Sequence, residues 1–125
     1  MTEQDIVKLL KDTKALRRLR SACEEAKKVL SSCLTTTINV DAFFNSLDIN
    51  IRITRAKLED LCRDIFQRCI PPLDNAIKDA KLSKEEINEI ILIGGSTRIP
   101  YVREMLKNYF NGKQLRIDVN PDEAV

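Results

Sequence analysis

The chain has 125 residues, of which 43% are hydrophobic and 32% are charged, a composition typical of a folded globular protein rather than a disordered segment. A net charge of +2 is too small to indicate nucleic-acid binding, and no apolar run approaches the roughly 18 residues that a membrane span needs. The acidic, polar N-terminus does not resemble a signal peptide, so we expect a cytoplasmic protein without membrane partners. The length predicts one domain or a pair of small lobes.

The cysteines and the absence of histidine restrict the possible chemistry. Cys23, Cys33, Cys62 and Cys69 form no CxxC motif, so a zinc site is not expected. Without histidine, Ser-His or Cys-His nucleophilic catalysis is excluded. Each cysteine falls on an apolar helical stripe, which predicts free, buried thiols in a reducing compartment.

Hydrophobic periodicity predicts two helices at the start of the chain. Residues 2–11 form a short amphipathic helix that Thr2 and Asp5 cap. A longer helix runs from Lys14 to about Ser32, because apolar residues recur at steps of three and four. The residues of this core-facing stripe are Leu16, Leu19, Cys23, Ala26, Leu30 and Cys33.

The opposite side of the longer helix has a polar face that comprises Glu24, Lys27, Lys28 and Ser31. One interpretation is a solvated surface with an internal Glu24–Lys28 ion pair. The other is a set of donors and acceptors directed at a sugar or a base.

Three arginines of the same helix, Arg17, Arg18 and Arg20, form a short basic patch. The patch lacks neighbouring aromatic residues that could stack on bases. We therefore interpret it as a solvated or partner-binding surface rather than a nucleic-acid site.

A change to a period of two predicts a hairpin next. Residues 36–42 and 49–53 alternate between apolar and polar side chains, with Asn45-Ser46 in a polar stretch between them. The expected buried face of the first strand consists of Thr36, Ile38, Val40 and Ala42.

Helical periods return after the hairpin. Thr54 is expected to cap a helix that runs to about Ile70. Pro71-Pro72 either ends that helix or begins the next, which continues to about Lys81. Ser83 and Glu86 then form a capping box over one short turn.

A strand, a glycine turn and a helix start follow within residues 90–100. Ile90–Ile93 predicts a buried strand, and Gly94-Gly95 permits a sharp turn and close approach of a ligand. Ser96 or Thr97 is expected to cap the next helix, with Pro100 in its first turn. Such a corner suits an anion or nucleotide, although it is neither a P-loop nor GxGxxG. A tight strand-to-helix turn without ligand remains the alternative.

The last segment predicts a helix over residues 102–110, with Asn111-Gly112 at its C-terminal end. A short strand is expected from Leu115 to Val119. Asn120-Pro121-Asp122-Glu123 has the pattern of a helix start, so we expect the chain to be truncated there.

Several of these motifs occur in an order that resembles the seventy-kilodalton heat-shock chaperones, the DnaK-type ATPases, from about Lys14 onward. They are Arg17-Arg18-Leu19-Arg20, Ala22-Cys23-Glu24 with Ala26-Lys27 and Leu30-Ser31-Ser32, Ile53-Thr54-Arg55-Ala56, Asp79-Ala80-Lys81-Leu82, Gly94-Gly95-Ser96-Thr97-Arg98-Ile99-Pro100, Phe110-Asn111-Gly112-Lys113 and Asn120-Pro121-Asp122-Glu123-Ala124-Val125. The resemblance implies an α/β fold of mixed α+β character, from lobe II of that family's actin-like nucleotide-binding domain. Residues 1–82 would be the upper subdomain, with helices and a small antiparallel sheet, and residues 83–125 part of the mixed-sheet lower subdomain. The family binds ATP and ADP between two lobes, and hydrolysis drives a peptide-binding chaperone cycle.

The resemblance also implies roles for individual residues. Glu24 and Lys27 match positions that bind the ribose hydroxyls, and Ser31 matches a serine facing the adenine edge. Lys28 stands where a second arginine commonly sandwiches the adenine, and lysine lacks a planar group to stack there.

The implied contacts of the C-terminal segment involve the glycine turn. Gly94, Gly95 and Ser96 match the turn beside the phosphates and ribose. Arg98 matches the arginine that stacks on the adenine, with Ile99 beside it. Asp122 matches an acid that lines the site.

The upper subdomain is also where the family's nucleotide exchange factors dock. Arg17 and Asp41 match such contacts, while Asn39 stands where an acid is common. The alternative is that these residues are ordinary exposed polar groups.

The family's phosphate-binding loops, catalytic lysine and magnesium-binding acids are not found in this sequence. We therefore expect no ATPase activity from this chain alone, weak nucleotide binding at best, and magnesium only with the missing lobe. The first alternative is a co-chaperone interaction module that needs no nucleotide, and an unrelated α/β domain ranks behind it. Apolar surface around Ile91, Ile93 and Val102 would be exposed, which allows a monomer or a weak dimer.

Overall fold

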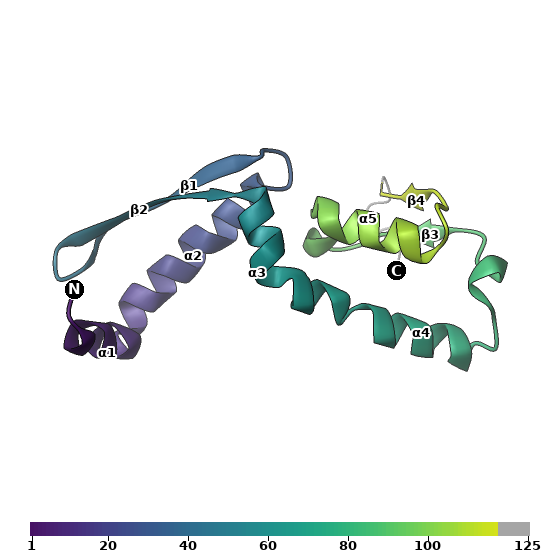
Figure 1. The fold of residues 1–125 in the computed structure, drawn as a ribbon, viewed down its shortest axis with the longest axis horizontal. Coiled ribbons are helices and arrows are strands. Elements are labelled where there is room, and N and C mark those ends of the chain that lie inside the picture. Colours follow the sequence, from purple (N-terminus) through teal and green to yellow (C-terminus); the bar gives the residue numbers. More distant parts are fainter. Residues whose placement is uncertain (118–125) are drawn as a thin grey trace. The chain divides into compact units, whose positions relative to one another are not determined.

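A computed structural model describes residues 1–117 of the chain. The chain forms two compact units, Met1–Leu58 and Glu59–Val125, and their boundary falls within helix α3, Arg55–Gln67 (Figure 1). The division into subdomains 1–82 and 83–125 rests on the family resemblance and stays a prediction. No helix within residues 1–117 is long and apolar enough to cross a membrane.

The first unit begins with the two predicted helices, α1 (Glu3–Lys11) and α2 (Thr13–Val29). Thr2 caps α1 in the predicted manner: its hydroxyl accepts from the Asp5 N–H at 3.2 Å, and the Asp5 carboxylate accepts from the Thr2 N–H at 2.9 Å. Asp12 caps α2 by accepting from the Ala15 N–H at 3.0 Å. These caps satisfy N–H groups that helix geometry leaves without partners.

The side of α2 that is buried differs in part from the predicted stripe. Ala15 and Ala26 are buried in α2, as is Leu30 just after it, whereas Cys23 and Cys33 are exposed. The core at Ala15 also contains Val40 and Phe43, with Leu9, Leu19, Ala22, Phe44 and Ile49 packed around it. Small residues at the centre of the contact let α2 approach the hairpin closely. Cys33 does not follow the helical period because α2 ends at Val29.

All four cysteines are free, but the prediction that they are buried was wrong. Cys23, Cys33 and Cys69 are exposed and Cys62 is half-buried. An apolar stripe of a helix is wider than the surface that one packing partner covers, so residues at its edge stay accessible.

The predicted hairpin is present as β1 (Thr35–Phe44) and β2 (Leu47–Thr54), paired antiparallel from Thr35–Thr54 to Val40–Ile49. Asn45 and Ser46 form the two-residue turn with φ of 49° and 61°. Positive φ at both positions gives the turn the twist that suits a tight hairpin.

A bulge interrupts β1 before the turn. Three residues, Asp41, Ala42 and Phe43, lie opposite Asp48 alone, between the pairs Val40–Ile49 and Phe44–Leu47. Ala42 has a φ of 45°, and its N–H donates to the Asp48 carboxylate at 2.6 Å. The bulge turns Phe43 into the core and leaves Ala42 exposed, so the prediction that Ala42 lies on the buried face was wrong.

The helices from α3 to η1 follow the prediction closely. α3 begins directly after Thr54, whose hydroxyl accepts from the Lys57 N–H at 3.1 Å. α4 (Ile70–Asp79) carries Pro71-Pro72 in its first turn, so the two prolines begin this helix rather than end α3. The short helix η1 (Lys84–Glu86) follows, and the Glu86 carboxylate accepts from the Ser83 N–H at 2.6 Å.

The remaining elements are β3 (Ile90–Ile91), η2 (Gly95–Arg98), α5 (Pro100–Tyr109) and β4 (Leu115–Arg116). Phe66, Ile99 and Val102 form a buried cluster in this unit, with Cys62, Tyr101, Met105 and Leu106 packed against it. Gly112 and Asn111 have positive φ just after α5, in agreement with the predicted C-terminal cap.

The prediction of a buried strand over residues 90–93 was wrong in length and in burial. β3 has two residues and pairs in parallel with β4, its one strand neighbour within residues 1–117. Leu92 is buried, whereas Ile91 and Ile93 are each 44% exposed, because alternate side chains of an extended chain face opposite sides. Val102, expected to share this exposed surface, is buried. The expected strand end at Val119 and helix start at Asn120–Glu123 lie outside the described residues.

Candidate functional site

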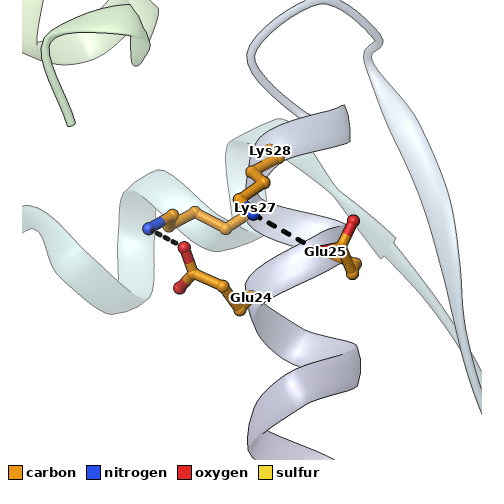
Figure 2. A network of polar contacts seen from close by, with 4 residues as sticks. All are labelled: Glu24, Glu25, Lys27 and Lys28. Atoms are coloured by element: carbon orange, nitrogen blue, oxygen red, sulfur yellow. Dashed lines mark hydrogen bonds and ion pairs between the residues drawn. The ribbon is translucent and has the colours of Figure 1, made fainter. Parts of the chain in front are cut away.

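The polar face of α2 contains two ion pairs in a register different from the predicted one. The Lys27 ammonium lies 2.7 Å from the Glu24 carboxylate, and the Lys28 ammonium lies 3.3 Å from the Glu25 carboxylate (Figure 2). The predicted Glu24–Lys28 pair is therefore not the one formed. Since successive helical residues are about 100° apart, the two pairs point in different directions around the axis.

The Glu24–Lys27 pair is accessible from solvent. Its side chains are 51% and 35% exposed, and the hydrogen bond from Lys27 lowers the pKa of Glu24. Glu24 is therefore held as a carboxylate acceptor, with an ammonium donor beside it. An accessible acceptor and donor at this spacing can bind adjacent hydroxyl groups of a ligand.

A shallow groove of about 510 Å³ runs beside this pair. Its lining residues are Leu16, Leu19, Arg20, Cys23, Glu24, Lys27 and Leu58. Arg20 belongs to this groove and not to the surface that Arg17 lines, so the structure divides the predicted basic patch. The spacing from Arg20 to Glu24, four residues in one helix, was a usable signal that they share a face.

Ser31 lies in the turn after α2, and Arg55 holds this turn in place. Arg55 Nε donates to the Leu30 carbonyl at 2.7 Å, and a terminal nitrogen donates to the Cys33 carbonyl at 3.2 Å. Ser31 is half-buried next to these contacts. Local sequence patterns could not show this role, because the two carbonyls lie 25 and 22 residues before Arg55.

The Gly94–Arg98 turn belongs to the second unit. Gly94 has φ of 104° and ψ of 154°, a backbone conformation that side chains disfavour, and no atom lies within 4 Å of a Cβ built there or at Gly95. The Thr97 hydroxyl donates to the Gly94 carbonyl at 2.6 Å, and Arg103 Nε donates to the Thr97 carbonyl at 2.8 Å. These two contacts hold the turn, so it is a formed structure rather than an open loop.

The predicted side-chain cap by Ser96 or Thr97 was wrong. The residue before α5 is Ile99, and no side chain caps the helix there, while Thr97 bonds back to the turn. Pro100 occupies the first turn of α5, as predicted.

A small concavity of about 140 Å³ lies at the turn. It is lined by Leu92, Ile93, Gly94, Gly95, Thr97, Arg98, Arg103 and Ile117. Ser96 and Arg98 are exposed, whereas Ile99 is 5% exposed and its side chain packs with Phe66 and Val102. The ligand contact that the resemblance implies for Ile99 stays a prediction.

The candidate partner-binding residues line a separate concavity of the first unit, of about 490 Å³. Its lining residues are Arg17, Arg18, Ser21, Ala22, Asn39, Val40 and Asp41. Arg18 donates from its two terminal nitrogens to the carbonyls of Ala42 at 3.0 Å and Asp41 at 2.5 Å. Arg17 and Asp41 thus line the same concavity, and Arg18 binds the backbone of β1 beside them.

Comparison with known proteins identifies the family. The family model described as "Hsp70 protein" matches residues 1–125. The chain belongs to the Hsp70 family. Its mixture of helices and small sheets agrees with the predicted α/β fragment of the actin-like Hsp70 ATPase domain.

Several curated Hsp70 proteins align with nearly the whole chain. Heat shock cognate 70 kDa protein 3 of Dictyostelium discoideum is 49% identical over 117 residues, 94% of this chain and 19% of the relative. A ribosome-associated molecular chaperone of Zygosaccharomyces rouxii is 54% identical over 114 residues, and one of Saccharomyces cerevisiae is 50% identical over 114. Both alignments cover 91% of this chain and 19% of the relative. The chain thus spans about a fifth of the length of these Hsp70 proteins.

Two parts of the expected Hsp70 site are not supplied by the described residues. Asp122 lies outside residues 1–117, so its place is not described. Within residues 1–117, no group of three or more Cys, Asp or Glu side chains could hold a metal ion.

Proposed function

We propose that this chain supplies adenosine contacts of an Hsp70-type ATP- and ADP-binding domain within a molecular chaperone. The exposed Glu24–Lys27 pair carries the proposal, because a carboxylate and an ammonium 2.7 Å apart match the donors and acceptors of vicinal ribose hydroxyls. The groove beside the pair provides apolar surface next to these polar groups. Ligand sites commonly combine an apolar lining with a few placed polar groups.

The Gly94–Arg98 turn is proposed to supply further contacts. Gly94 and Gly95 leave the backbone open to close approach, and the exposed Arg98 guanidinium can stack on an adenine ring. Lys28 cannot stack in this way, and it pairs with Glu25. We therefore expect the adenine to be held more weakly on the Lys28 side.

The proposal assigns no ATPase activity to the chain alone. Phosphoryl transfer requires charge stabilisation around the γ-phosphate by metal and cationic groups. Within residues 1–117, no three Cys, Asp or Glu side chains form a group that could hold a metal ion. We propose that magnesium binds only together with the lobe that supplies the phosphate contacts.

Calorimetric titration of the chain with ADP tests the adenosine role. Glu24→Ala and Arg98→Ala are expected to abolish saturable binding, because they remove the ribose acceptor and the stacking group. Glu25→Ala, which disrupts the neighbouring ion pair, is the matched control and is expected to bind as the unmodified chain does. Equal binding by Glu24→Ala would exclude the ribose contact. No binding of millimolar ADP by the folded, unmodified chain would exclude a preformed site.

A second candidate function is docking of nucleotide exchange factors or other co-chaperones, and it could operate without nucleotide. The concavity that Arg17 and Asp41 line favours it, because a partner can place one acidic and one basic side chain there. Pull-down by a purified exchange factor is expected to be lost in the Arg17→Ala, Asp41→Ala double variant. Unchanged capture would end this candidate and leave the adenosine proposal standing.

We also propose a cellular location and an oligomeric state for the chain. Two relatives are named ribosome-associated chaperones, which supports a cytoplasmic location for this chain. The exposed side chains of Ile91 and Ile93 permit a weak dimer as well as a monomer. Sedimentation at several concentrations would distinguish the two states.

A further inference from the structure

The β1 bulge leaves main-chain groups that the hairpin does not pair. Asp41, Ala42 and Phe43 have no paired partners in the register of β1 and β2. The Ala42 N–H is satisfied by the Asp48 carboxylate at 2.6 Å. The carbonyls of Asp41 and Ala42 are satisfied by one side chain from α2, the fork of Arg18, at 2.5 and 3.0 Å.

The Arg18 contact connects the two elements that carry the proposed docking residues, α2 with Arg17 and β1 with Asp41. Arg18 is the next residue after Arg17 in α2, and the carbonyl that it binds at 2.5 Å belongs to Asp41 itself. A guanidinium holds two acceptors in a fixed, planar geometry, which an ammonium cannot reproduce. Arg18 therefore links the segment of α2 that carries Arg17 to the backbone of Asp41.

We propose that Arg18 is a positioning residue of the docking surface: it fixes the bulge so that Asp41 faces a basic group of the partner while Arg17 faces an acidic one. This inference rests on the proposed docking of exchange factors. Arg18 itself is occupied by the two carbonyls and makes its contribution through Asp41. Holding the bulge before binding removes part of the ordering cost of association.

Arg18→Lys tests the proposal, since it keeps the charge and removes the fork. The assay measures association and dissociation rates of a purified nucleotide exchange factor. We expect the dissociation constant to rise about tenfold, mainly through faster dissociation, with an unchanged salt dependence of the association rate. Arg52→Lys on exposed β2 is the matched control, because no described residue provides Arg52 with a side-chain hydrogen bond or ion pair.

A double-mutant cycle separates positioning from direct contact. Asp41→Asn is expected to weaken binding strongly in the unmodified chain and only slightly in the Arg18→Lys background, because Asp41 is then no longer held in place. Additive effects, or unchanged binding by Arg18→Lys, would overturn the positioning role. The amide NMR signals of Ala42 and Asp48 should shift in Arg18→Lys while those of α1 stay, which shows that the variant is folded.

The same data distinguish the two proposals. If Arg17→Ala and Asp41→Ala leave binding unchanged, the docking surface itself is refuted. If they weaken binding and Arg18→Lys does not, the docking surface stands and the positioning role fails.

Discussion

Replacing Arg55 with methionine should destabilise the turn that carries Ser31. Methionine keeps an apolar stem of similar length but removes the hydrogen bonds to the Leu30 and Cys33 carbonyls. The first bond is 2.7 Å long and partly buried, and the second is 3.2 Å long and exposed to solvent. A hydrogen bond to a charged group contributes about 1.5–3 kcal/mol, and the exposed one contributes less. Arg55 also lies near the negative end of α2, which adds about 0.3–1 kcal/mol.

Together these contributions predict that Arg55→Met lowers the free energy of unfolding by about 2–4 kcal/mol. Urea unfolding followed by circular dichroism measures this change, with Arg52→Met as the control for loss of an exposed arginine. Arg55→Lys should retain an intermediate stability, because a point charge can bind one carbonyl but not both.

A local measurement adds a second criterion. The Cys33 N–H donates to the Val29 carbonyl at 2.8 Å, and its hydrogen exchange should become faster in Arg55→Met than in Arg52→Met. The Arg55 side chain does not hold this turn if two results are found together. The losses in free energy of unfolding for Arg55→Met and Arg52→Met would differ by less than about 0.5 kcal/mol, and hydrogen exchange at Cys33 would be unchanged.

Two further predictions concern the second unit. The hydrogen bond that Tyr109 donates to Asp74 raises the pKa of Tyr109 to about 12 from its ordinary value of 10.0. Because this pKa is raised on folding, the stability that the hydrogen bond contributes is complete below about pH 10 and is lost as the pH rises through 12. Ultraviolet titration of the Tyr101→Phe variant, in which Tyr109 is the one remaining tyrosine, should show the raised pKa. Adding Asp74→Asn should return this pKa toward 10.0, and an unchanged titration would exclude Asp74 as the cause. Gly94→Ala should cost about 1–3 kcal/mol in urea unfolding, because φ of 104° is strained for any side chain although the space is open. Gly95→Ala, at a position with open space and no such φ, is the control, and equal costs for the two variants would refute strain as the reason.

The N-terminal elements illustrate what periodicity and capping can establish alone. Thr2 and Asp5 specify the start of α1, and the alternation around Asn45-Ser46 specifies a hairpin, because these signals act over a few residues. The order of motifs was sufficient to indicate the family, which the comparison bears out. The Glu24 and Lys27 side chains were also correctly placed on one face, although the nucleotide that they are proposed to bind stays untested.

Other features depended on contacts between distant residues. The bulge that exposes Ala42 and buries Phe43 depends on packing against α2 and on Arg18, which lies 24 residues away from Ala42. Lys113 likewise donates to the carbonyls of Lys84 and Glu85 at 3.0 and 3.1 Å. No local sequence pattern predicts these hydrogen bonds, because the partners lie 29 and 28 residues apart. A long side chain with several donors can reach any nearby carbonyl, so its partner is known only once the chain has folded.

The sequence by itself determined the family, the order of the elements and several of their starts, such as those of α1 and α3, since these follow from periodicity, capping and short motifs. The tertiary structure decided which edge of each apolar stripe is buried, where β1 bulges and which lysine pairs with Glu24. It also decided that Arg20 and Arg17 line different concavities, while Arg18 binds backbone carbonyls. The physical reason is that burial and long side-chain hydrogen bonds depend on distances between segments, and a linear pattern does not contain those distances.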